Sequence, residues 1–287
     1  MRDFSGDHQA LSINTATVRK QARLDQIIDA CARRDIRMIC PWRDQVHAVG
    51  LGGIAAQLRA AGIELSGYCR GGFFPAADDA GLTAALEDNR RAIDEAAALG
   101  SPCLVLVVGS LPGALTGKAA YKDIQVARAQ VLDGIEATLQ HARQAKLPLA
   151  IEPLHPMQAA ERACVNTLEQ ALDICDALDP EKSGALGVAV DVYHVWWDPK
   201  LAAQIARAGR ERLFAFHVCD WLLGTRDLLN DRGMMGDGII ELQKIRGWLE
   251  AAGYRGPAEV EIFSEDWWAR PLDDVLTTCI ERHRSVV

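Results

Sequence analysis

Short apolar segments rich in β-branched residues alternate along the chain with longer segments rich in alanine, leucine, glutamate and arginine. Most of the short segments are apolar at both odd and even positions, which is typical of strands buried on both faces of a parallel sheet. The longer segments carry the helical period. The eight predicted strands are Ala10–Asn14, Ile36–Cys40, Ile63–Gly67, Cys103–Val108, Leu149–Glu152, Gly187–Asp191, Phe214–Val218 and Ala258–Ile262.

Several of the predicted helices between these strands have recognisable ends. Residues Leu82–Leu99 precede Gly100, and a glycine just past the last helical residue is a common helix terminator. Asn166 and Glu169 have the spacing of a capping box, so a helix is predicted to begin there. Further helices are predicted over Ala119–Lys146, in one piece or two, and over Ile239–Ala252.

Strict alternation of strand and helix predicts a parallel sheet with helices outside it. Eight such units in 287 residues, with no Gly/Ser/Pro-rich linker, favour a single-domain (β/α)₈ TIM barrel over residues 1–287. Such barrels typically have ~250 residues. The alternative is an open Rossmann-like sheet, which requires Gly-x-Gly-x-x-Gly after an early strand. The glycine-rich segment 50–53 follows a loop and has the wrong spacing.

Composition narrows the class of protein. Apolar residues make up 49% of the chain and charged residues 24%, which is the ordinary globular range. The 39 acids exceed the 31 Lys and Arg residues, so the net charge is −8, the opposite of a typical nucleic-acid binder. The longest apolar run, Cys103–Val108, is far shorter than the ~20 residues that span a bilayer. We expect neither a nucleic-acid nor a membrane partner.

Cysteine usage and the N-terminal residues bear on location. None of the eight cysteines forms a Cys-x-x-Cys pair, and a chain of this size does not need a disulfide framework. A zinc ribbon would require that paired spacing. The first residues carry acids and no apolar stretch, so no signal peptide is expected. These features predict a reduced, cytoplasmic protein.

Four successive predicted strands end on residues that bind metals. They are Glu152, Asp191, His217 and Glu261. In a β/α barrel the C-terminal strand ends surround one mouth, which holds the active site. Converging carboxylates repel each other unless a cation lies between them, so the cluster predicts a divalent metal. Glu259 shares the parity of Glu261 and is expected one layer deeper, or paired with a basic residue.

The ligand types narrow the metal and the chemistry. Three carboxylates and one imidazole suit Mn²⁺, the expected ion, or Mg²⁺ or Co²⁺, and suit structural zinc poorly. Four protein ligands leave about two octahedral positions for a substrate that chelates through adjacent oxygens. Such a metal polarises a carbonyl and stabilises an enediolate. Glu152 and Glu261 come from strands on opposite sides of the metal, so they are predicted to act as acid and base on two faces of a bound sugar.

The segments around these ligands resemble the four metal-ligand motifs of a known family, the metal-dependent sugar (phosphate) isomerases and epimerases of the xylose-isomerase-like TIM barrels. Relatives include D-tagatose 3-epimerase, hydroxypyruvate isomerase, inosose dehydratase and 3-dehydroshikimate dehydratase. The resemblance implies that the four residues bind the metal, that Glu152 and Glu261 are the proton-transfer pair, and that a homo-oligomer is an option. The motifs are Ile151-Glu152-Pro153, Asp191-Val192-Tyr193-His194, His217-Val218-Cys219-Asp220 and Glu259-Val260-Glu261.

The resemblance also implies substrate-binding residues. His194 matches a substrate-binding histidine of the epimerase branch, and Arg232 resembles an arginine that holds substrate oxygens. That branch places a second substrate-contacting glutamate six residues after the first metal glutamate, where this chain has Gln158. This departure leaves the epimerase chemistry open. His155 is a candidate substitute, or an ordinary loop histidine.

Other pocket candidates come from the residue types near predicted strand ends. Aromatic rings pack well against the apolar face of a sugar, and Trp42 and Trp197 are the preferred pocket members. Arg70, placed after the third strand, is predicted to hold a substrate oxygen or carboxylate, or to form a loop salt bridge. Residues 231–238 are expected to form a mobile loop over the mouth.

The sequence therefore predicts a divalent-metal-dependent isomerase or epimerase of a keto-sugar or related polyhydroxy carbonyl compound. A lyase on the same scaffold shares the first step, abstraction of the proton α to the carbonyl. It then eliminates a β-leaving group from an inosose or a 3-keto-glycoside, with His155 or His194 as the acid. A DNA-repair barrel resembling endonuclease IV would need three zinc ions and a basic surface, and a non-catalytic binding barrel would have a broken ligand set.

Overall fold

The strands of the computed structural model, which describes residues 1–287, form one sheet in which every pairing is parallel. The strand order is β3-β2-β1-β9-β8-β7-β6-β5-β4. Only Ser66 and Gly67 separate β3 from β4, so the two ends of this order are consecutive in the chain and the sheet nearly closes into a barrel. The strands are β1 (Leu11–Asn14), β2 (Met38–Cys40), β3 (Glu64–Leu65), β4 (Tyr68–Gly72), β5 (Leu104–Val107), β6 (Leu149–Ile151), β7 (Leu186–Asp191), β8 (Leu213–Val218) and β9 (Ala258–Val260).

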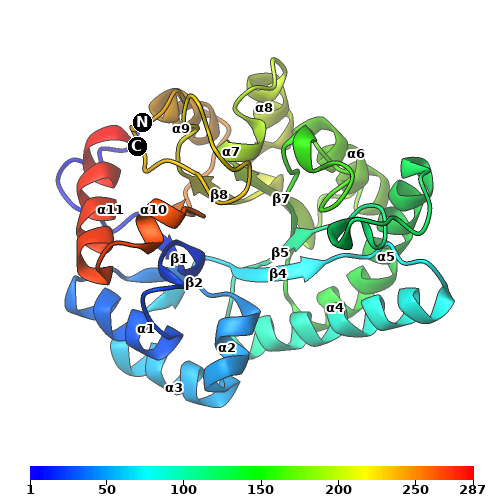
Figure 1. The fold of residues 1–287 in the computed structure, drawn as a ribbon, viewed down its shortest axis with the longest axis horizontal. Helices are drawn as coiled ribbons and strands as arrows, with labels where there is room; N and C mark the ends of the chain where they lie inside the picture. Colours follow the sequence, from blue (N-terminus) through cyan, green and yellow to red (C-terminus); the bar gives the residue numbers. More distant parts are fainter.

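The helices lie around the outside of the strands (Figure 1). This arrangement confirms the predicted single-domain β/α barrel, with β3 and β4 together occupying the third strand position. The helices are α1 (Leu24–Arg33), α2 (Arg43–Val49), α3 (Leu51–Ala61), α4 (Asp79–Leu99), α5 (Ile124–Ala145), α6 (Leu168–Leu178), α7 (Val192–Val195), α8 (Leu201–Arg212), α9 (Leu242–Ala251), α10 (Glu265–Trp268) and α11 (Leu272–Val286).

The third strand departs most from its prediction, because it continues as β4 beyond the predicted end at Gly67. Strands are depleted in glycine, so Gly71 and Gly72 concealed the continuation. Both glycines are required by the close approach of β5. A Cβ on Gly71 would lie 2.9 Å from side-chain atoms of Leu104 and Leu106, and Gly72 has a φ of +102°.

Helix boundaries were predicted less well than strands. Helix α5 is a single helix whose N-cap is Asp123, so residues 119–122 lie outside it. The N-cap of α6 is Thr167, whose side chain accepts a hydrogen bond from the backbone N–H of Gln170. The predicted capping box was therefore wrong by one residue. The threonine is the better-placed side chain because its hydroxyl reaches that free N–H group.

The barrel interior explains how the strand ends present polar groups. Residues two positions apart on a strand face the same side. One inward layer holds small residues that form a buried cluster with cysteines of β2 and β4, and the next layer holds the predicted ligands. The inward pairs are Ala150 and Glu152, Ala189 and Asp191, and Ala215 and His217. In β9 the lower layer holds Glu259 in place of a small residue, with Glu261 above it.

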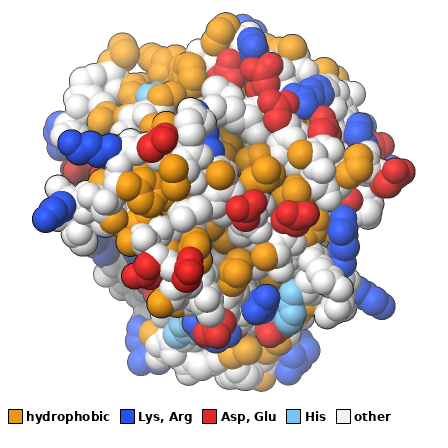
Figure 2. Space-filling view, turned by 90° about the vertical axis from the view of Figure 1, so that its right-hand side faces the viewer, with side chains coloured by type: hydrophobic (Ala, Val, Ile, Leu, Met, Phe, Trp, Pro, Cys, Tyr) orange, Lys and Arg blue, Asp and Glu red, His pale blue; other side chains and the backbone are white.

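None of the helices combines the length and apolar character needed to cross a membrane. On the face formed around α4, α5 and α6, acidic, basic and apolar side chains are interspersed (Figure 2). All eight cysteines are free and buried.

A buried arginine at the end of α8, directly before β8, connects the helix layer to the barrel. Arg212 is 1% exposed and donates to the Asp179 carboxylate at 2.8 Å and to the Leu186 carbonyl at 2.7 Å. We expect Arg212→Met to lower the free energy of unfolding by about 3 kcal/mol, because it leaves buried acceptors without their donor. Denaturant titration measures this loss. Arg207→Met is the control, since Arg207 forms only exposed ion pairs worth ~0–1 kcal/mol. Equal denaturant concentrations at the midpoint of unfolding for the two variants would contradict the prediction.

Candidate metal centre and substrate cavity

The four predicted ligands converge at the C-terminal mouth of the barrel. One ligand atom from each lies within 4.8 Å of the others, and all four residues are buried. Asp191 and His217 are also register partners in β7 and β8, which fixes them at the same level of the sheet. Glu152 and Glu261 follow β6 and β9 directly and reach the same layer.

The cluster fits a divalent cation. Glu152 Oε1 and His217 Nδ1 lie 2.9 Å apart, yet neither makes a hydrogen bond, because the two groups are not aligned for one. Buried polar atoms without a partner are rare and costly. An ion held between them would satisfy both atoms. The donor set of three carboxylates and one imidazole is the set that hard divalent ions prefer.

The electrostatics of the cluster also call for positive charge. Burial, and then the nearby Glu152 carboxylate, raise the pKa of Glu261 to about 8 although Arg232 opposes the shift. Burial alone would lower the pKa of His217. The carboxylates of Glu259, Glu152 and Glu261 outweigh that effect and raise its pKa well above the ordinary value. Without a cation, the site must therefore hold protons to offset its carboxylates.

Glu259 lies one layer below the cluster, as predicted. Its Oε1 atom is 3.4 Å from His217 Nε2, and its carboxylate accepts from Asn14 Nδ2 at 2.8 Å and from Ser66 Oγ at 2.7 Å. Asn14 Nδ2 also donates to Glu261 Oε1 at 3.0 Å. Outer carboxylates of this kind orient metal-binding histidines. Asn14 was not predicted as a site residue, although it is a buried polar residue at the C-terminal end of β1.

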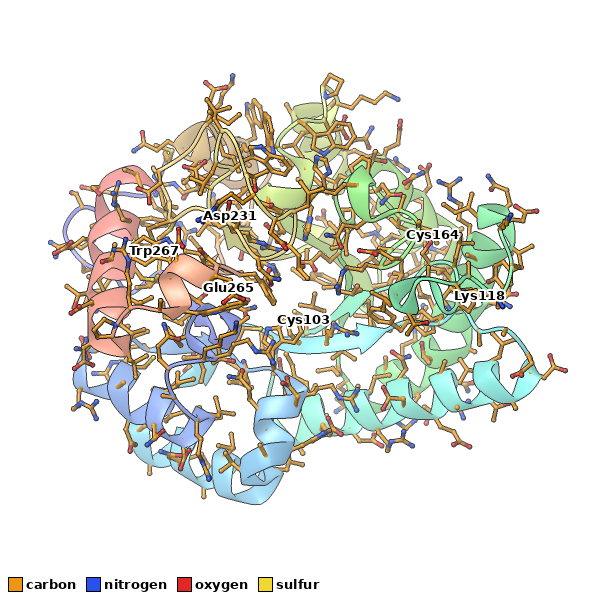
Figure 3. All side chains as sticks on the ribbon, viewed as in Figure 1. Cys103, Lys118, Cys164, Asp231, Glu265 and Trp267 are labelled. Atoms are coloured by element: carbon orange, nitrogen blue, oxygen red, sulfur yellow. The ribbon has the colours of Figure 1, made fainter.

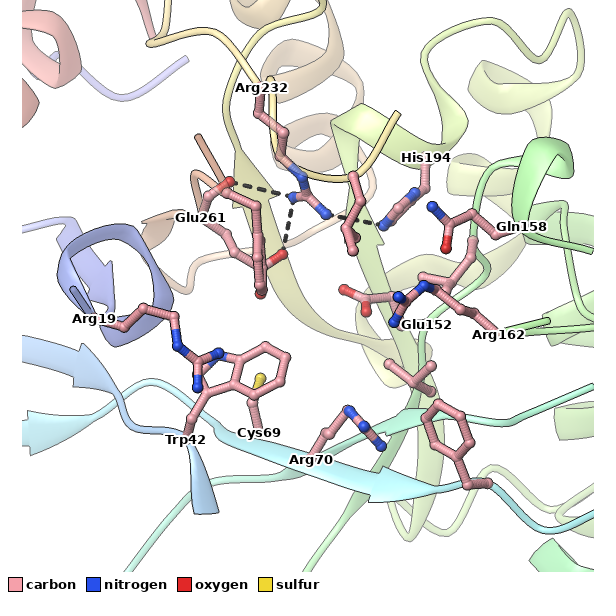
Figure 4. A pocket seen from close by; sticks show the side chains of 15 residues that line it. Arg19, Trp42, Cys69, Arg70, Glu152, Gln158, Arg162, His194, Arg232 and Glu261 are labelled. Atoms are coloured by element: carbon pink, nitrogen blue, oxygen red, sulfur yellow. Dashed lines mark hydrogen bonds and ion pairs between the residues drawn. The ribbon is translucent and has the colours of Figure 1, made fainter. Parts of the chain in front are cut away.

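A cavity of about 190 Å³ opens above the cluster. Pockets for drug-sized ligands have volumes of ~300–1,000 Å³, so this smaller cavity suits a smaller molecule. Figure 4 shows Glu152 and Glu261 on different sides of the cavity, with Arg232 above them and Arg70 below. The predicted residues that line it are Glu152, Glu261, His194, Arg232, Trp42 and Arg70.

Arg232 and His194 form a connected pair beside the ligands. Arg232 Nη1 lies 2.9 Å from Asp191 Oδ2 and 3.0 Å from Glu261 Oε2, and its Nη2 lies 3.2 Å from His194 Nε2. His194 Nδ1 accepts a hydrogen bond from the backbone N–H of His155. Burial lowers the pKa of His194 to about 3, so its ring is neutral. The arginine therefore supplies the positive charge at this edge of the cluster.

Trp42 and Arg70 differ in how free they are. The indole Nε1 of Trp42 donates to Asn14 Oδ1 at 2.7 Å, so its ring borders the cavity while its N–H is already engaged. Arg70 lies within β4 rather than after the third strand as predicted. Its guanidinium carbon is 4.1 Å from the Phe73 ring centroid, and it forms neither an ion pair nor a hydrogen bond. The loop salt bridge considered as an alternative is absent.

His155 and Trp197 do not line the cavity. The His155 ring stacks on Trp221 with centroids 5.0 Å apart and meets the edge of Trp197. The indole N–H of Trp197 donates to the carbonyl of His194 at 2.8 Å. Both residues thus donate a hydrogen bond to His194 without lining the cavity themselves. Gln158, at the position where the resemblance places a second substrate-contacting glutamate, also lines the cavity, as do four residues that were not predicted, Arg19, Phe73, Arg162 and Phe263.

The loop after β8 brings Arg232 to the cavity. The carboxylate of Asp220 accepts three backbone hydrogen bonds at 2.9 Å, from Trp221, Gly236 and Ile240, and so gathers both ends of the loop. Figure 3 shows Asp231 on this loop beside Glu265 of α10, and Asp231 forms an isolated bridge with the neighbouring Ser264. We predicted a mobile cover. In the structure residues 231–235 are buried, with Met234 and Met235 fully so, whereas Gly236 and Asp237 are exposed.

We expect Asp220→Ala to lower kcat/KM about 10²-fold, because a displacement of ~1 Å in a positioning group costs about that much. Asp220→Asn should lose less, since its oxygen can still accept from Trp221 and Ile240. The control is Asp237→Asn in the same loop, which breaks an ion pair with Arg282 of α11. Metal content measured on each variant separates a loop effect from loss of the cation. An Asp220→Ala variant with full activity would exclude this role.

Comparisons with known proteins agree with this geometry. The family model described as xylose isomerase-like TIM barrel matches residues 38–280. The crystal structure of a protein from Sinorhizobium meliloti 1021 is 58% identical, with a TM-score of 0.92 over 97% of this chain and 98% of that one. An inosose isomerase from Bacillus velezensis is 22% identical over 289 residues, covering 96% of each chain. The structure of an IolI protein with bound zinc is 18% identical, with a TM-score of 0.82 over 96% of this chain and 97% of that one.

Proposed function

We propose that this chain, which belongs to the xylose isomerase-like TIM barrel family, is a divalent-metal-dependent isomerase or epimerase of a keto-sugar or a related polyhydroxy carbonyl compound. The observation that carries the proposal is the buried cluster of Glu152, Asp191, His217 and Glu261 at the barrel mouth. Two of its carboxylates, Glu152 and Glu261, also line the small cavity. The cluster thus combines a cation site with two groups that can move protons.

The four clustered residues would hold the cation, and Mn²⁺ is the expected ion, with Mg²⁺ or Co²⁺ as alternatives. When bound there, it would polarise a substrate carbonyl and stabilise the negative charge of an enediolate. Arg232 and His194 lie next to the cluster and are placed to bind substrate oxygens. The rings of Trp42 and Phe263 form an apolar part of the cavity wall, which would keep water away from the reacting carbons.

The proton transfers are assigned to the two glutamates. A carboxylate on one face of the substrate takes the proton α to the carbonyl, and the electrons of the broken C–H bond enter the enediolate. The protonated carboxyl on the other face, or the same one, then returns a proton. Return to the neighbouring carbon, with the proton of the α-hydroxyl passing to the former carbonyl oxygen, gives isomerisation. Return to the opposite face of the same carbon gives epimerisation. Because Glu152 and Glu261 lie on different sides of the cavity, both outcomes are accessible (Figure 4).

The substrate class rests on the cavity and on the relatives. A small cavity bordered by aromatic rings and hydrogen-bond donors suits a monosaccharide-sized polyol. The name of the inosose isomerase of Bacillus velezensis supports including ketoinositols among the candidate substrates. The zinc in the IolI structure supports metal binding by this fold, and makes zinc one outcome of metal analysis. A cytoplasmic location remains a prediction from the sequence.

The geometry favours isomerisation over elimination. A lyase needs an acid beside the leaving group, and His155 and His194 are the candidates. His155 does not line the cavity, and both ring nitrogens of His194 already face partners, the N–H of His155 and the guanidinium of Arg232. Of the acid–base groups that line the cavity, the two glutamates remain, and they suffice for isomerisation or epimerisation.

Deuterium incorporation tests the proposed function. The Mn²⁺-loaded protein is incubated in D₂O with a panel of ketohexoses, inososes and 3-keto-glycosides, and products are analysed by NMR. We expect deuterium at the carbon α to the carbonyl in the substrate, its isomer or its epimer. An unsaturated product would instead show a lyase. No exchange with any member of the panel would overturn the proposed chemistry.

A further inference from the structure

Two arginines of the cavity donate no hydrogen bond to a carboxylate, and only Arg162 has a carboxylate within ion-pair distance. Arg70 reaches it from β4 and stacks on Phe73, with no ion pair or hydrogen bond to its guanidinium. Arg162 reaches it from the loop after β6. The nearest carboxylate to Arg162 is that of its chain neighbour Glu161 at 3.6 Å, and Arg162 Nε is buried without a hydrogen-bond partner. Both guanidinium groups are therefore available to a bound molecule.

The charges of the cluster do not use these arginines. The carboxylates of Glu152, Asp191 and Glu261 would be balanced by a divalent cation together with Arg232, which lies about 3 Å from two of them. A third arginine of the wall, Arg19, is paired with Asp44. With the cation bound, Arg70 has no carboxylate partner, and Arg162 has only the partly exposed Glu161 carboxylate, 3.6 Å from its Nε.

The proximity of these two cations is unfavourable without an anion. Burial, with repulsion from Arg162, lowers the pKa of Arg70 to about 10, so it remains charged at neutral pH. The neighbouring Gln158 is 4% exposed and its Oε1 lacks a hydrogen-bond partner, so this side of the cavity carries a neutral amide rather than a carboxylate. The partly exposed Glu161 carboxylate, 3.6 Å from Arg162 Nε, is left to offset two arginines.

We propose that the substrate is anionic and that Arg70 and Arg162 bind its carboxylate or phosphate group. The inference rests on the proposed function and specifies its substrate class. Guanidinium groups pair with carboxylates and phosphates through two parallel hydrogen bonds, which a hydroxyl cannot match. Figure 4 shows Arg70 across the cavity from Arg232, so the charged group lies at the end of the substrate remote from the oxygens near Arg232.

Matched ketohexoses test this inference. D-fructose, D-fructuronate and D-fructose 6-phosphate differ at carbon 6, which carries a hydroxymethyl, a carboxylate or a phosphate group. Isothermal titration of each into the Mn²⁺-loaded protein measures binding, and NMR in D₂O measures exchange separately. We expect one of the anionic members to bind roughly 10- to 100-fold more tightly than D-fructose, the range for hydrogen bonds to charged groups. Whichever of the two anionic ligands binds more tightly shows whether the arginines bind a carboxylate or a phosphate group.

Substitutions locate the anion on the two arginines. Arg70→Gln and Arg162→Gln should each weaken binding of the favoured anion roughly 10- to 100-fold and affect D-fructose far less. Arg70→Lys should retain part of the preference, which guards against a folding defect in the glutamine variant. Arg19→Gln is the matched control. It removes a cavity arginine that already has a partner, so the ratio of anionic to neutral affinity should stay unchanged.

The two measurements separate this inference from the proposed function. Anion-selective binding that depends on Arg70, without deuterium exchange, supports the inference and counts against the proposed reaction. Exchange with equal affinity for neutral and anionic members overturns the inference and supports the reaction. Weak or equal binding of all three ligands, or selectivity that persists in both glutamine variants, also overturns it.

Discussion

Glu152→Gln and Glu261→Gln are each expected to lower kcat by about 10²- to 10⁴-fold, the range for loss of a general acid or base. Glutamine keeps the shape of the side chain and one oxygen that can bind a cation, but it neither accepts nor releases a proton near neutral pH. Both residues are 4% exposed and line the cavity, so water is poorly placed to replace them. Steady-state kinetics on the substrate identified by deuterium exchange measures the effect.

Two controls make that result specific. Metal content of each variant must remain near that of the unmodified protein, since the glutamates are also ligands. Glu265→Gln removes an exposed carboxylate that pairs only with Lys20, and it should leave kcat unchanged. Near-full activity in either the Glu152 or the Glu261 variant would show that the proton-transfer pair has been assigned wrongly.

The sequence was sufficient for the barrel because parallel strands buried on both faces leave a continuous apolar signal. Segments such as Leu104–Val107 and Leu186–Asp191 were predicted within one residue for that reason. It was also sufficient to predict that the four ligands converge, because the barrel topology places the C-terminal ends of β6 to β9 at one mouth. Residues far apart in sequence become neighbours by that rule alone.

The cavity wall was harder to predict, because loops approach it along paths that no periodicity encodes. Arg162 follows β6 by eleven positions in an irregular segment, yet it reaches the cavity. Trp197 has the residue type of a sugar-binding wall, but its N–H is bonded to the carbonyl of His194 one turn earlier. Arg70 was expected in a loop, where it would hold a substrate oxygen or form a salt bridge, whereas β4 carries it to the cavity wall without a salt bridge. Residue type suggested candidates, and only tertiary packing separated wall residues from supporting ones.

Removing the metal is expected to abolish activity, because the enediolate charge would then have no cation beside it. Dialysis against a chelator, followed by addition of Mn²⁺, Mg²⁺, Co²⁺ or Zn²⁺ to separate samples, measures both the loss and the ion that restores turnover. The same samples report stability. An ion present at a hundredfold excess over its Kd adds about 2.7 kcal/mol to the free energy of unfolding, so thermal unfolding should shift upward on reconstitution.

Asp191→Asn distinguishes a bound ion from a general effect of salt. Asp191 is fully buried beneath the cavity and is not proposed to move a proton, so its substitution removes ligand charge without removing an acid or base. The variant should lose most of the metal-induced rise in unfolding temperature and retain less metal after dialysis. If the chelated, metal-free protein turned over substrate at an undiminished rate, the cluster would have to act through its carboxylates and Arg232 alone, and the metal-dependent chemistry would be wrong.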